Sequence, residues 1–429
     1  MKFRYGKDDI EISLDSKWNI TIFQPTGQKS IEKPIVKIKE SINNPIGSLP
    51  LKEILDNKSN LKTVCIVSSD ATRPVPSNLI LEALIDELNA YGINDKQIII
   101  LVATGLHRAT YKDELERILG KNLKNRIKVV NHQAYDKECL IQIGNLSESN
   151  PILVNKYYTN ADLKILTGYV EPHFFFGFSG GRKSVVPGIL GAQTIQINHS
   201  AERINSKYAR FGIYEENPLH KQAIEISNLI GVDFIVNVCI NGDHEIIQVA
   251  AGDLIKAHER LVEYQKEHIF REIEGLYDIV ICGNGGYPLD LNLYQAVKSM
   301  AIGEMAVKKG GTIIAVNECA DGIGQEKFEE LLFSGMTPTE IYEKILNKEI
   351  YLPDQWEIQI LARILMKAEI FIISELSENE IGNIGLKYAK SVEEAIKISL
   401  RKYGKDASIL ILPNGPSVLP LLKTSNITK

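Results

Sequence analysis

Apolar and polar positions along the chain alternate between short strand patterns and longer helical patterns. The apolar runs KTVCIVSSD (62–70) and QIIILVATG (97–105) are each followed by an amphipathic helical pattern. We expect Ser77 to cap the first of these helices, and Thr110 with Asp113 resembles a capping box before the second. A chain in which strands and helices alternate folds into a parallel, doubly wound α/β sheet.

Two other patterns organise the rest of the chain. Two strand-like runs joined by Asn241 and Gly242 predict a β-hairpin, and alternating apolar residues over 10–14 predict a small antiparallel element. A second alternating series begins after the segment REIEGLYD. We therefore expect two doubly wound α/β domains, 1–272 and 273–429, with a cleft between them and small antiparallel β elements in the N-terminal domain.

Composition narrows the class of protein. The chain has 429 residues, of which 44% are hydrophobic and 24% charged, as in a globular protein with a substantial core. A formal net charge of -5 argues against a nucleic-acid partner, and no apolar stretch has the length of a membrane span. The charged start lacks the apolar stretch of a secretory signal, and five scattered cysteines without a CxxC pair indicate reduced thiols. We expect a cytoplasmic protein.

Residues capable of chemistry follow the predicted strands. Ligands of open α/β sheets bind outside the carboxyl ends of the strands. The candidates at these ends are Asp70, Arg73, His107, Glu171, His173, Arg182 and Lys183, followed in the second domain by Tyr294, Gln295 and Lys298 on one helical face. Singly, an Asp after a strand usually caps a turn and a lone His is usually structural. Their shared location favours a functional site.

The loop GFSGGRKS (177–184) is the most unusual of these segments. It nearly matches a phosphate-binding P-loop, but Arg182 stands where the last Gly should be, which argues against a nucleoside triphosphatase. The backbone at Gly180, Gly181 and Ser184 remains suited to the approach of a phosphate. The segment CGNGG lacks the third Gly of a dinucleotide loop, and no HExxH or clustered Cys/His spacing occurs.

Several motifs together resemble the nickel-dependent lactate racemase family. They are SSDATRPVP (68–76), TGLHR (104–108), EPHFFFGFSGGRKSVVPG (171–188), NHS (198–200), GYPLDLNLYQAVK (286–298) and PDQWE (353–357). The motifs keep the order that they have in the family and extend over nearly the whole chain. Their joint occurrence is highly specific.

The resemblance implies a racemase or epimerase of a small 2-hydroxy acid, with lactate as the default substrate. It implies a nickel-pincer nucleotide, pyridinium-3-thioamide-5-thiocarboxylic acid mononucleotide, bound covalently to Lys183 through a thioamide. His199 matches the protein ligand of Ni(II), and His107 and His173 match two alternating bases and acids. The residues around Lys183 are then expected to bind the cofactor as well. They are Gly180, Gly181, Arg182 and Ser184.

The same resemblance assigns substrate binding and partners. Arg73 and Lys298 match carboxylate-binding residues, with Tyr294 and Gln295 beside them. Asp70 matches a residue near the cofactor, and Trp356 matches one near the substrate. We expect the proteins that synthesise the cofactor to be partners of the chain. We expect no nucleic-acid partner and no membrane partner, and the sequence allows a homo-oligomer.

Two alternatives stay open at this point. His107, His173 and His199 could form a three-histidine site in a zinc or nickel hydrolase. The chain could also be a non-catalytic two-domain protein that closes on an organic anion, although a tethering lysine would have no purpose there. The sequence does not determine which 2-hydroxy acid is the substrate.

Overall fold

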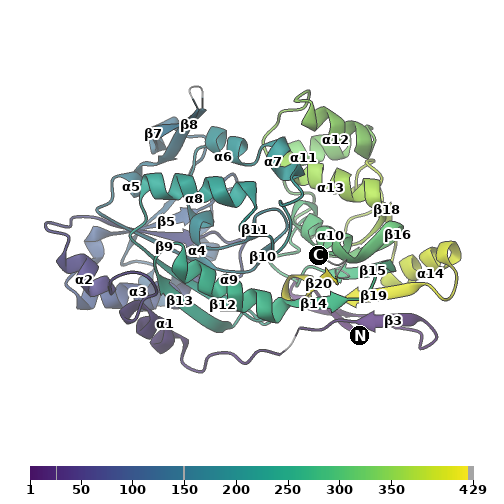
Figure 1. Cartoon of the computed structure of the whole chain (residues 1–429), viewed down its shortest axis with the longest axis horizontal. Coiled ribbons are helices and arrows are strands. Elements are labelled where there is room, and N and C mark those ends of the chain that lie inside the picture. The colour runs from purple at the N-terminus through teal and green to yellow at the C-terminus, as the bar shows by residue number, and fades with distance from the viewer. Residues whose placement is uncertain (26, 148–149, 424–429) are drawn as a thin grey trace, which may run out of the picture. The chain divides into compact units, whose positions relative to one another are not determined.

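The computed structural model describes residues 1–25, 27–147 and 150–423. The chain forms two compact units, which we call the central unit (27–267) and the terminal unit (1–26 and 268–429) (Figure 1). Both are α/β units built around a six-stranded sheet, as the sequence predicts. Among the described residues, no helix combines the length and the apolar character that crossing a membrane requires.

The central unit contains a sheet with the strand order β13-β12-β9-β4-β5-β6. Neighbouring strands are parallel except β12 and β13, which form the hairpin predicted around Asn241 and Gly242. The strands are β4 (Val64–Ser69), β5 (Ile98–Ala103), β6 (Lys128–Asn131), β9 (Leu163–Tyr169), β12 (Phe234–Ile240) and β13 (Ile246–Gly252). Strands that are buried on both faces carry continuous apolar runs, which is why the sequence pattern identified them.

Helices and loops cover both faces of this sheet. Helices α1, α3 and α4 pack on the face that carries Ile66, Ile100 and Ile165, whereas α5 and a short 3-10 helix at Gly181–Ser184 lie over β4 and its neighbours. The helices are α1 (Pro34–Asn43), α2 (Leu51–Asp56), α3 (Ser77–Ala90), α4 (Lys112–Leu123), α5 (Lys156–Thr159), α6 (Ala192–Asn198), α7 (Ala201–Asn205), α8 (Pro218–Ile230) and α9 (Lys256–Ile269). Two small antiparallel ladders accompany them, β7 (Leu140–Ser147) with β8 (Asn150–Asn155) and β10 (Pro172–His173) with β11 (Gly177–Phe178).

The terminal unit contains an all-parallel sheet with the strand order β18-β17-β16-β15-β19-β3. Its strands are β3 (Asn19–Ile22), β15 (Tyr277–Gly283), β16 (Val307–Val316), β17 (Glu369–Ile373), β18 (Lys387–Tyr388) and β19 (Ser408–Leu412). Beside the sheet lie the hairpin of β1 (Lys2–Tyr5) with β2 (Asp8–Glu11) and the parallel pair of β14 (Phe270–Ile273) with β20 (Leu419–Leu422).

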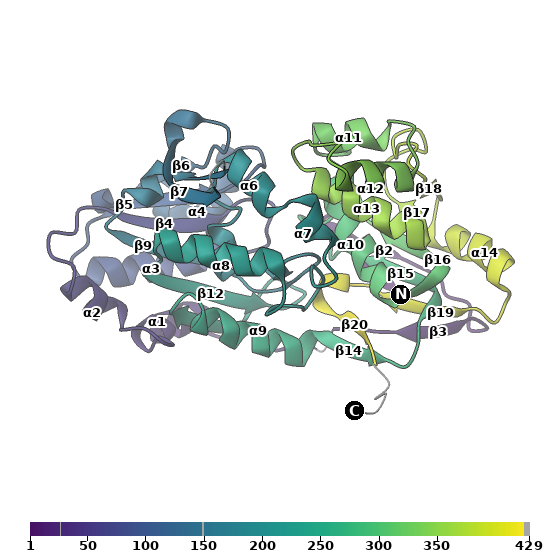
Figure 2. The same ribbon diagram turned by 45° about the horizontal axis from the view of Figure 1, so that its top comes forward.

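Five helices complete the terminal unit. They are α10 (Leu293–Ala306), α11 (Glu326–Leu332), α12 (Pro338–Leu346), α13 (Gln355–Lys367) and α14 (Val392–Tyr403). Ala395 and Ile396 of α14 pack with Ile314 on one face of the sheet, whereas Gly303 of α10 lies against Ile313 on the other face. Helices α11, α12 and α13 pack together beside α10 (Figure 2).

The N-terminal segment belongs to the terminal unit, whereas the sequence pattern assigns it to a domain of residues 1–272. Strand β3 pairs with β19 at the edge of the terminal sheet, and Phe3, only 1% exposed, lies in the same core as Ile279 and Ile409. A short alternating strand shows which of its faces is buried but not which strand it pairs with. The other boundary, between 267 and 268, lies close to the expected one.

Helix caps differ from the sequence expectation by single residues. Pro76 is the N-cap of α3 and Ser77 is its first residue. The capping box of α4 joins Tyr111 and Glu114 instead of Thr110 and Asp113, with the backbone N–H of Tyr111 donating to the Glu114 carboxylate at 2.8 Å.

Candidate functional site

The candidate residues of the central unit follow the carboxyl ends of β4, β5 and β9. From β4 the chain adds β5 and β6 on one side and later β9 and β12 on the other, so β4 and β9 flank the topological switch point. Asp70 directly follows β4, His107 lies in the loop after β5, and the segment 170–191 follows β9. Three adjacent strand ends therefore carry the predicted residues of this unit.

Asp70 and His107 form a hydrogen-bonded pair. The Nδ1 atom of His107 lies 2.7 Å from Oδ2 of Asp70, a side chain that is only 5% exposed. Burial favours the neutral acid and by itself would raise the pKa of Asp70. This effect is outweighed by the charges of His107 and Arg73 and by hydrogen bonds from His107 and Thr72. The pKa of Asp70 is therefore lowered to about 2. An ionised carboxylate only accepts hydrogen bonds, so Nδ1 of His107 carries the proton.

Thr72 and Arg73 extend this pair. The hydroxyl of Thr72 donates to Oδ1 of Asp70 at 2.7 Å, and its backbone N–H reaches the same oxygen at 3.2 Å. Nη1 of Arg73 donates to the Thr72 hydroxyl at 3.1 Å. One hydroxyl therefore connects the predicted carboxylate-binding residue to the Asp70–His107 pair. Asp70 thus closes a turn and orients a histidine at the same time.

His173 lies in the small ladder of β10 and β11, where it is opposite Gly177. Its Nδ1 atom accepts a hydrogen bond from the backbone N–H of Phe176 at 3.2 Å. Gly177 has a φ of 80°, and a Cβ at this position would overlap the carbonyl oxygen of Ile213. The tight loop therefore requires glycine, and it holds His173 against the backbone of the phenylalanine run.

Phe175 and Phe176 connect the remaining candidates. The ammonium of Lys183 lies 4.6 Å from the ring centroid of Phe176 and 5.7 Å from that of Phe175. The His199 ring centroid lies 5.3 Å from that of Phe175 and 5.8 Å from that of Phe176. The His173 ring centroid lies 4.6 Å from that of Phe175 and 6.0 Å from that of Phe176. Three predicted side chains from two motifs therefore share two aromatic neighbours.

His199 suits the role of a metal ligand. It is 3% exposed at the C-terminal end of α6, and its burial, with the nearby charge of Lys183, lowers the pKa of its imidazole to about 3. A histidine binds a metal ion through its neutral form. Lys183 and His199 are thus an amine and an imidazole near the same aromatic rings, as the predicted lysine-tethered nickel nucleotide would need.

Arg182, a predicted cofactor-binding residue, supports the loop from inside. It is fully buried, and its guanidinium donates to the carbonyl oxygens of Phe176, Phe178, Ser179 and Gly180 at 2.8–3.3 Å. Burial lowers the pKa of Arg182 to about 10. Its side chain therefore holds the backbone that precedes Lys183.

Gly181 and Ser184 also anchor this loop to the sheet. The backbone N–H of Gly181 donates to Oδ1 of Asn237 at 2.7 Å, and the hydroxyl of Ser184 donates to the carbonyl oxygen of Thr167 at 2.9 Å. Gly180 has a φ of 75°, and a Cβ there would lie 2.8 Å from Asn237. These residues fix the position of the loop that contains Lys183.

The terminal unit presents a second set of candidates on α10. Nζ of Lys298 donates to Oε1 of Gln295 at 2.9 Å, which confirms that these two residues share a face. The N-cap Asn292 accepts from the backbone N–H of Gln295 at 3.0 Å and so fixes the start of the helix. A cation and an amide are therefore held together there, and both groups can donate hydrogen bonds to a carboxylate.

Tyr294 and Trp356 meet between α10 and α13. Tyr294 is 7% exposed and Trp356 is 5% exposed. The Tyr294 hydroxyl donates to Oδ1 of Asp354 at 3.3 Å. Burial is the main reason why the pKa of Tyr294 lies well above its usual value, and hydrogen bonding from Trp356 opposes this shift. The two aromatic residues proposed for the substrate therefore also join two helices.

The glycine-rich loop after β15 packs on the N-terminal hairpin. The backbone N–H of Tyr287 donates to the carbonyl oxygen of Gly6 at 2.7 Å, and a Cβ on Gly286 would lie 2.8 Å from the same oxygen. The glycines of CGNGG therefore serve the close approach of two backbone segments, which explains this motif without a dinucleotide.

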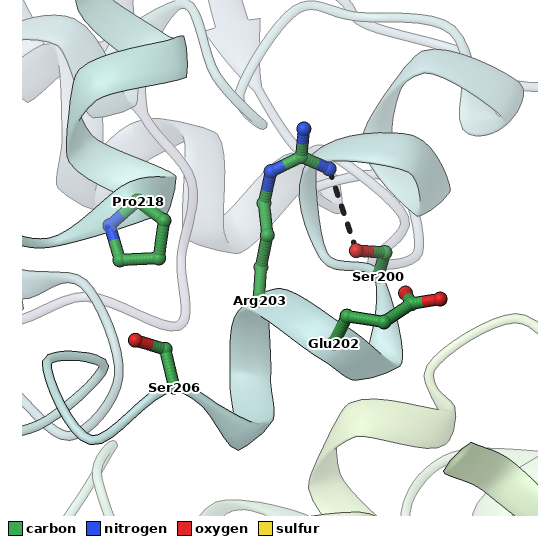
Figure 3. A pocket seen from close by; sticks show the side chains of 5 residues that line it. All are labelled: Ser200, Glu202, Arg203, Ser206 and Pro218. Atoms are coloured by element: carbon green, nitrogen blue, oxygen red, sulfur yellow. Dashed lines mark hydrogen bonds between the residues drawn. The ribbon is translucent and has the colours of Figure 1, made fainter.

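An open pocket lies beside α7 and is lined by Ser200, Glu202, Arg203, Ser206 and Pro218 (Figure 3). Arg203 donates to the carbonyl oxygen of Ile197 at 2.6 Å and to the hydroxyl of Ser200 at 3.3 Å. The lining residues do not include any of the predicted site residues. Ser200 directly follows His199, so the pocket adjoins the predicted nickel ligand in sequence.

Sequence reasoning missed Thr72, Phe175 and Phe176 as parts of the site. Thr72 stood inside a motif without a chemical role of its own, and the phenylalanines have the pattern of core residues. Within residues 1–25, 27–147 and 150–423, no three His, Cys, Asp or Glu side chains gather into a group that could hold a metal ion. A three-histidine hydrolase site is therefore not supported.

Comparisons with known proteins show the family of the chain. Residues 5–212 match the lactate racemase N-terminal domain, and residues 274–420 match the lactate racemase C-terminal domain. The chain is 40% identical over 422 residues to a lactate racemase of Thermoanaerobacterium thermosaccharolyticum, covering 97% of each chain. It is 39% identical over 386 residues to a lactate racemase of Lactiplantibacillus plantarum, covering 89% of this chain and 90% of the relative.

Solved structures give the same assignment. The lactate racemase apoprotein of Thermoanaerobacterium thermosaccharolyticum superposes with a TM-score of 0.89 at 37% identity, covering 98% of this chain and 99% of that one. A protein of Thermotoga maritima shares the fold with a TM-score of 0.70 at 20% identity, over 94% and 100% of the two chains. The chain belongs to the lactate racemase family, a family of isomerases.

Proposed function

We propose that the protein racemises lactate or a closely related 2-hydroxy acid with a nickel-pincer nucleotide bound to Lys183. The observation that carries this proposal is the arrangement of His173, Lys183 and His199 around two phenylalanine rings, next in the fold to the Asp70–His107 pair. Membership of the lactate racemase family supports the reaction class.

The residues present fit the proposed cofactor. Lys183 would hold it through a thioamide, and neutral, buried His199 would bind the nickel ion. When bound, the cofactor supplies a site that takes a hydride from the substrate carbon and returns it to either face of the planar keto acid. Arg182, Gly181 and Ser184 hold the loop, so Lys183 is presented from a rigid backbone.

His107 is the proposed base for the substrate hydroxyl. With its proton fixed on Nδ1 by Asp70, the Nε2 atom of neutral His107 carries a lone pair. It takes the hydroxyl proton as the alcohol is oxidised, and the ionised Asp70 stabilises the imidazolium that forms. His173 is the second acid or base, which a reaction on two faces of the keto acid requires.

Arg73 and Lys298 are the proposed carboxylate-binding residues. The planar guanidinium of Arg73 can bind a carboxylate through two hydrogen bonds, whereas Lys298 contributes a single charge. We propose that Gln295, Tyr294 and Trp356 contribute to substrate binding from α10 and α13. The cofactor-synthesising partners, the cytoplasmic location and a homo-oligomer remain predictions from the sequence.

Mass spectrometry tests the proposal most directly. Protein produced in cells that synthesise the cofactor should carry an adduct of mononucleotide size on Lys183, contain about one nickel ion and racemise D- and L-lactate. Lys183→Ala should lose adduct and activity, and His199→Ala should lose nickel while remaining folded. Lys221→Ala, on the exposed side of α8, is the matched control. An adduct mapped to another lysine, or lactate bound without racemisation, would contradict the proposal, and the second result would favour an anion-binding protein.

A further inference from the structure

The Nδ1 atoms of His107 and His173 make hydrogen bonds of opposite direction. Nδ1 of His107 lies 2.7 Å from Oδ2 of Asp70 and donates to this carboxylate. Nδ1 of His173 accepts from the backbone N–H of Phe176 at 3.2 Å. A backbone N–H cannot accept a hydrogen bond and a carboxylate cannot donate one, so the two directions are determined by the partners.

These bonds determine where each neutral ring carries its single proton. Because Nδ1 of His107 is protonated, its Nε2 atom has a lone pair and accepts. Because Nδ1 of His173 accepts from Phe176, its Nε2 atom has the proton and donates. The two histidines are therefore opposite tautomers, and which nitrogen is protonated follows from the bond at the other nitrogen.

Neither ring can change its tautomer without a rearrangement around it. On the His107 side, the hydroxyl of Thr72 donates to Oδ1 of Asp70 at 2.7 Å, so both carboxylate oxygens have fixed partners. On the His173 side, the tight loop at Gly177 leaves no room for a Cβ beside Ile213, so the Phe176 N–H is held in place.

We propose that the two histidines are unequal bases: neutral His107 presents a lone pair at Nε2 and can take a proton directly, whereas neutral His173 presents an N–H at Nε2 and cannot. Each ring returns a proton only from the imidazolium that it has formed. This inference rests on the proposed function for its catalytic meaning. The hydroxyl proton of one enantiomer moves to Nε2 of His107 and forms an imidazolium beside Asp70. For the other enantiomer, His173 must first present a lone pair at Nε2, which places a proton on Nδ1 against the Phe176 N–H.

The difference between the two histidines should appear in the rates of the two half-reactions. Racemisation has an equilibrium constant of one, so kcat/KM must be equal in the two directions whatever the histidines do. The difference therefore shows in kcat and KM taken separately and in the rates of the two half-reactions. We expect the half-reaction that uses His107 as base to be at least about tenfold faster than the one that uses His173, because a cost of about 1.4 kcal/mol for the change of tautomer at His173 already amounts to a factor of ten.

The tautomers can be measured without cofactor or substrate. In protein with ¹⁵N-labelled histidine, NMR should show neutral His107 protonated at Nδ1 and neutral His173 protonated at Nε2, with assignments from His107→Gln and His173→Gln. Asp70→Asn, whose side-chain amide can donate or accept, should mix the tautomers of His107 only, and Thr72→Val, which keeps the Asp70 carboxylate, should keep the single tautomer. Thr159→Val, which removes a hydroxyl bound to the carbonyl oxygen of Asn155, should leave both rings unchanged.

The outcomes separate this inference from the proposed function. The same tautomer in both rings would overturn the inference, whatever the enzyme does, and so would equal single-turnover rates for the two enantiomers in loaded enzyme. If Asp70→Asn does not fold, the wild-type and Thr72→Val spectra still decide. Opposite tautomers in a protein that carries the cofactor but does not racemise lactate would uphold the assignment of protons and contradict the proposed function.

Discussion

At the scale of single residues, the sequence identified chemical groups but not their partners. The ends of predicted strands pointed to Asp70, His107, His173 and Lys183, because ligands of α/β sheets bind at such ends. The pairing of Asp70 with His107 joins residues 37 positions apart, and no local pattern encodes it. The burial of Arg182 also escaped prediction, because most arginines are exposed and its acceptors are carbonyl oxygens of its own loop.

Asp70→Asn tests the pair at this scale. The amide is nearly isosteric but lacks the charge that stabilises an imidazolium on His107, so we expect kcat to fall about 10²–10⁴-fold. KM should change little if Arg73 keeps its position. The assay is racemisation per bound nickel ion, with Asp86→Asn on α3 as the control. A loss that disappears when activity is normalised to nickel would show that Asp70 serves cofactor loading, as the family resemblance suggests.

At the scale of elements, strands and helices were predictable and their connections less so. Buried runs such as 62–70 specify parallel strands, and amphipathic patterns specify the helices between them. The β7–β8 hairpin was missed because its residues are mostly half-exposed and alternate weakly. Helix α10 ends at Ala306 and β16 begins directly at Val307.

Gly177→Ala tests whether the β10–β11 loop depends on one backbone position. A residue with a side chain at positive φ costs about 1–2 kcal/mol, and here the new methyl group would also overlap the carbonyl oxygen of Ile213. Gly92→Ala is the matched control, because Gly92 has a φ of 91° and a methyl group added there would meet nothing within 4 Å. Chemical unfolding should show a clearly larger loss for Gly177→Ala. Equal losses in the two variants would mean that the loop adapts.

His132 links three segments and makes stability depend on pH. Its Nε2 atom donates to the carbonyl oxygen of Leu190 at 2.9 Å, and its Nδ1 lies 3.1 Å from Nδ2 of Asn155. Burial lowers the pKa of His132 to about 4 from 6.5, so between these values the unfolded chain binds more protons than the folded one. Stability is therefore lost as pH falls through this range, by on the order of 3 kcal/mol for this group.

Urea unfolding at several pH values measures this dependence. His132→Asn should be less stable than wild type at pH 7.5, because a buried hydrogen bond is lost, but its stability should fall less steeply between about pH 6.5 and 4. His244→Asn, in the hairpin turn between β12 and β13, is the control. Parallel curves for wild type and His132→Asn would show that other groups cause the loss.

At the scale of the whole molecule, the two α/β units were predictable from the two alternating series. The assignment of the first 26 residues was not, because strand pairing across hundreds of residues leaves no trace in a local pattern. Strand β3 pairs with β19 and Phe3 packs beside Ile279, so the unit formed by residues 268–429 is completed by the start of the chain. Its helix α10 carries Gln295 and Lys298, so this N-terminal segment supports a candidate substrate-binding helix.

Phe3→Ala tests this organisation. Removing a fully buried aromatic ring costs about 3–5 kcal/mol, and the loss should fall on the terminal unit, whose core contains Phe3 together with Ile281 and Ile411. Hydrogen exchange followed by mass spectrometry should show faster exchange in β15, β16 and β19, whereas β4, β5 and β9 of the central unit stay protected. Phe333→Ala is the control, because this ring in the same unit is 40% exposed and little burial is lost. If the strands of both units lost protection equally, the two units would unfold together as one cooperative body. If protection in β15 and β19 stayed unchanged, the N-terminal segment would contribute nothing to the core that it contacts.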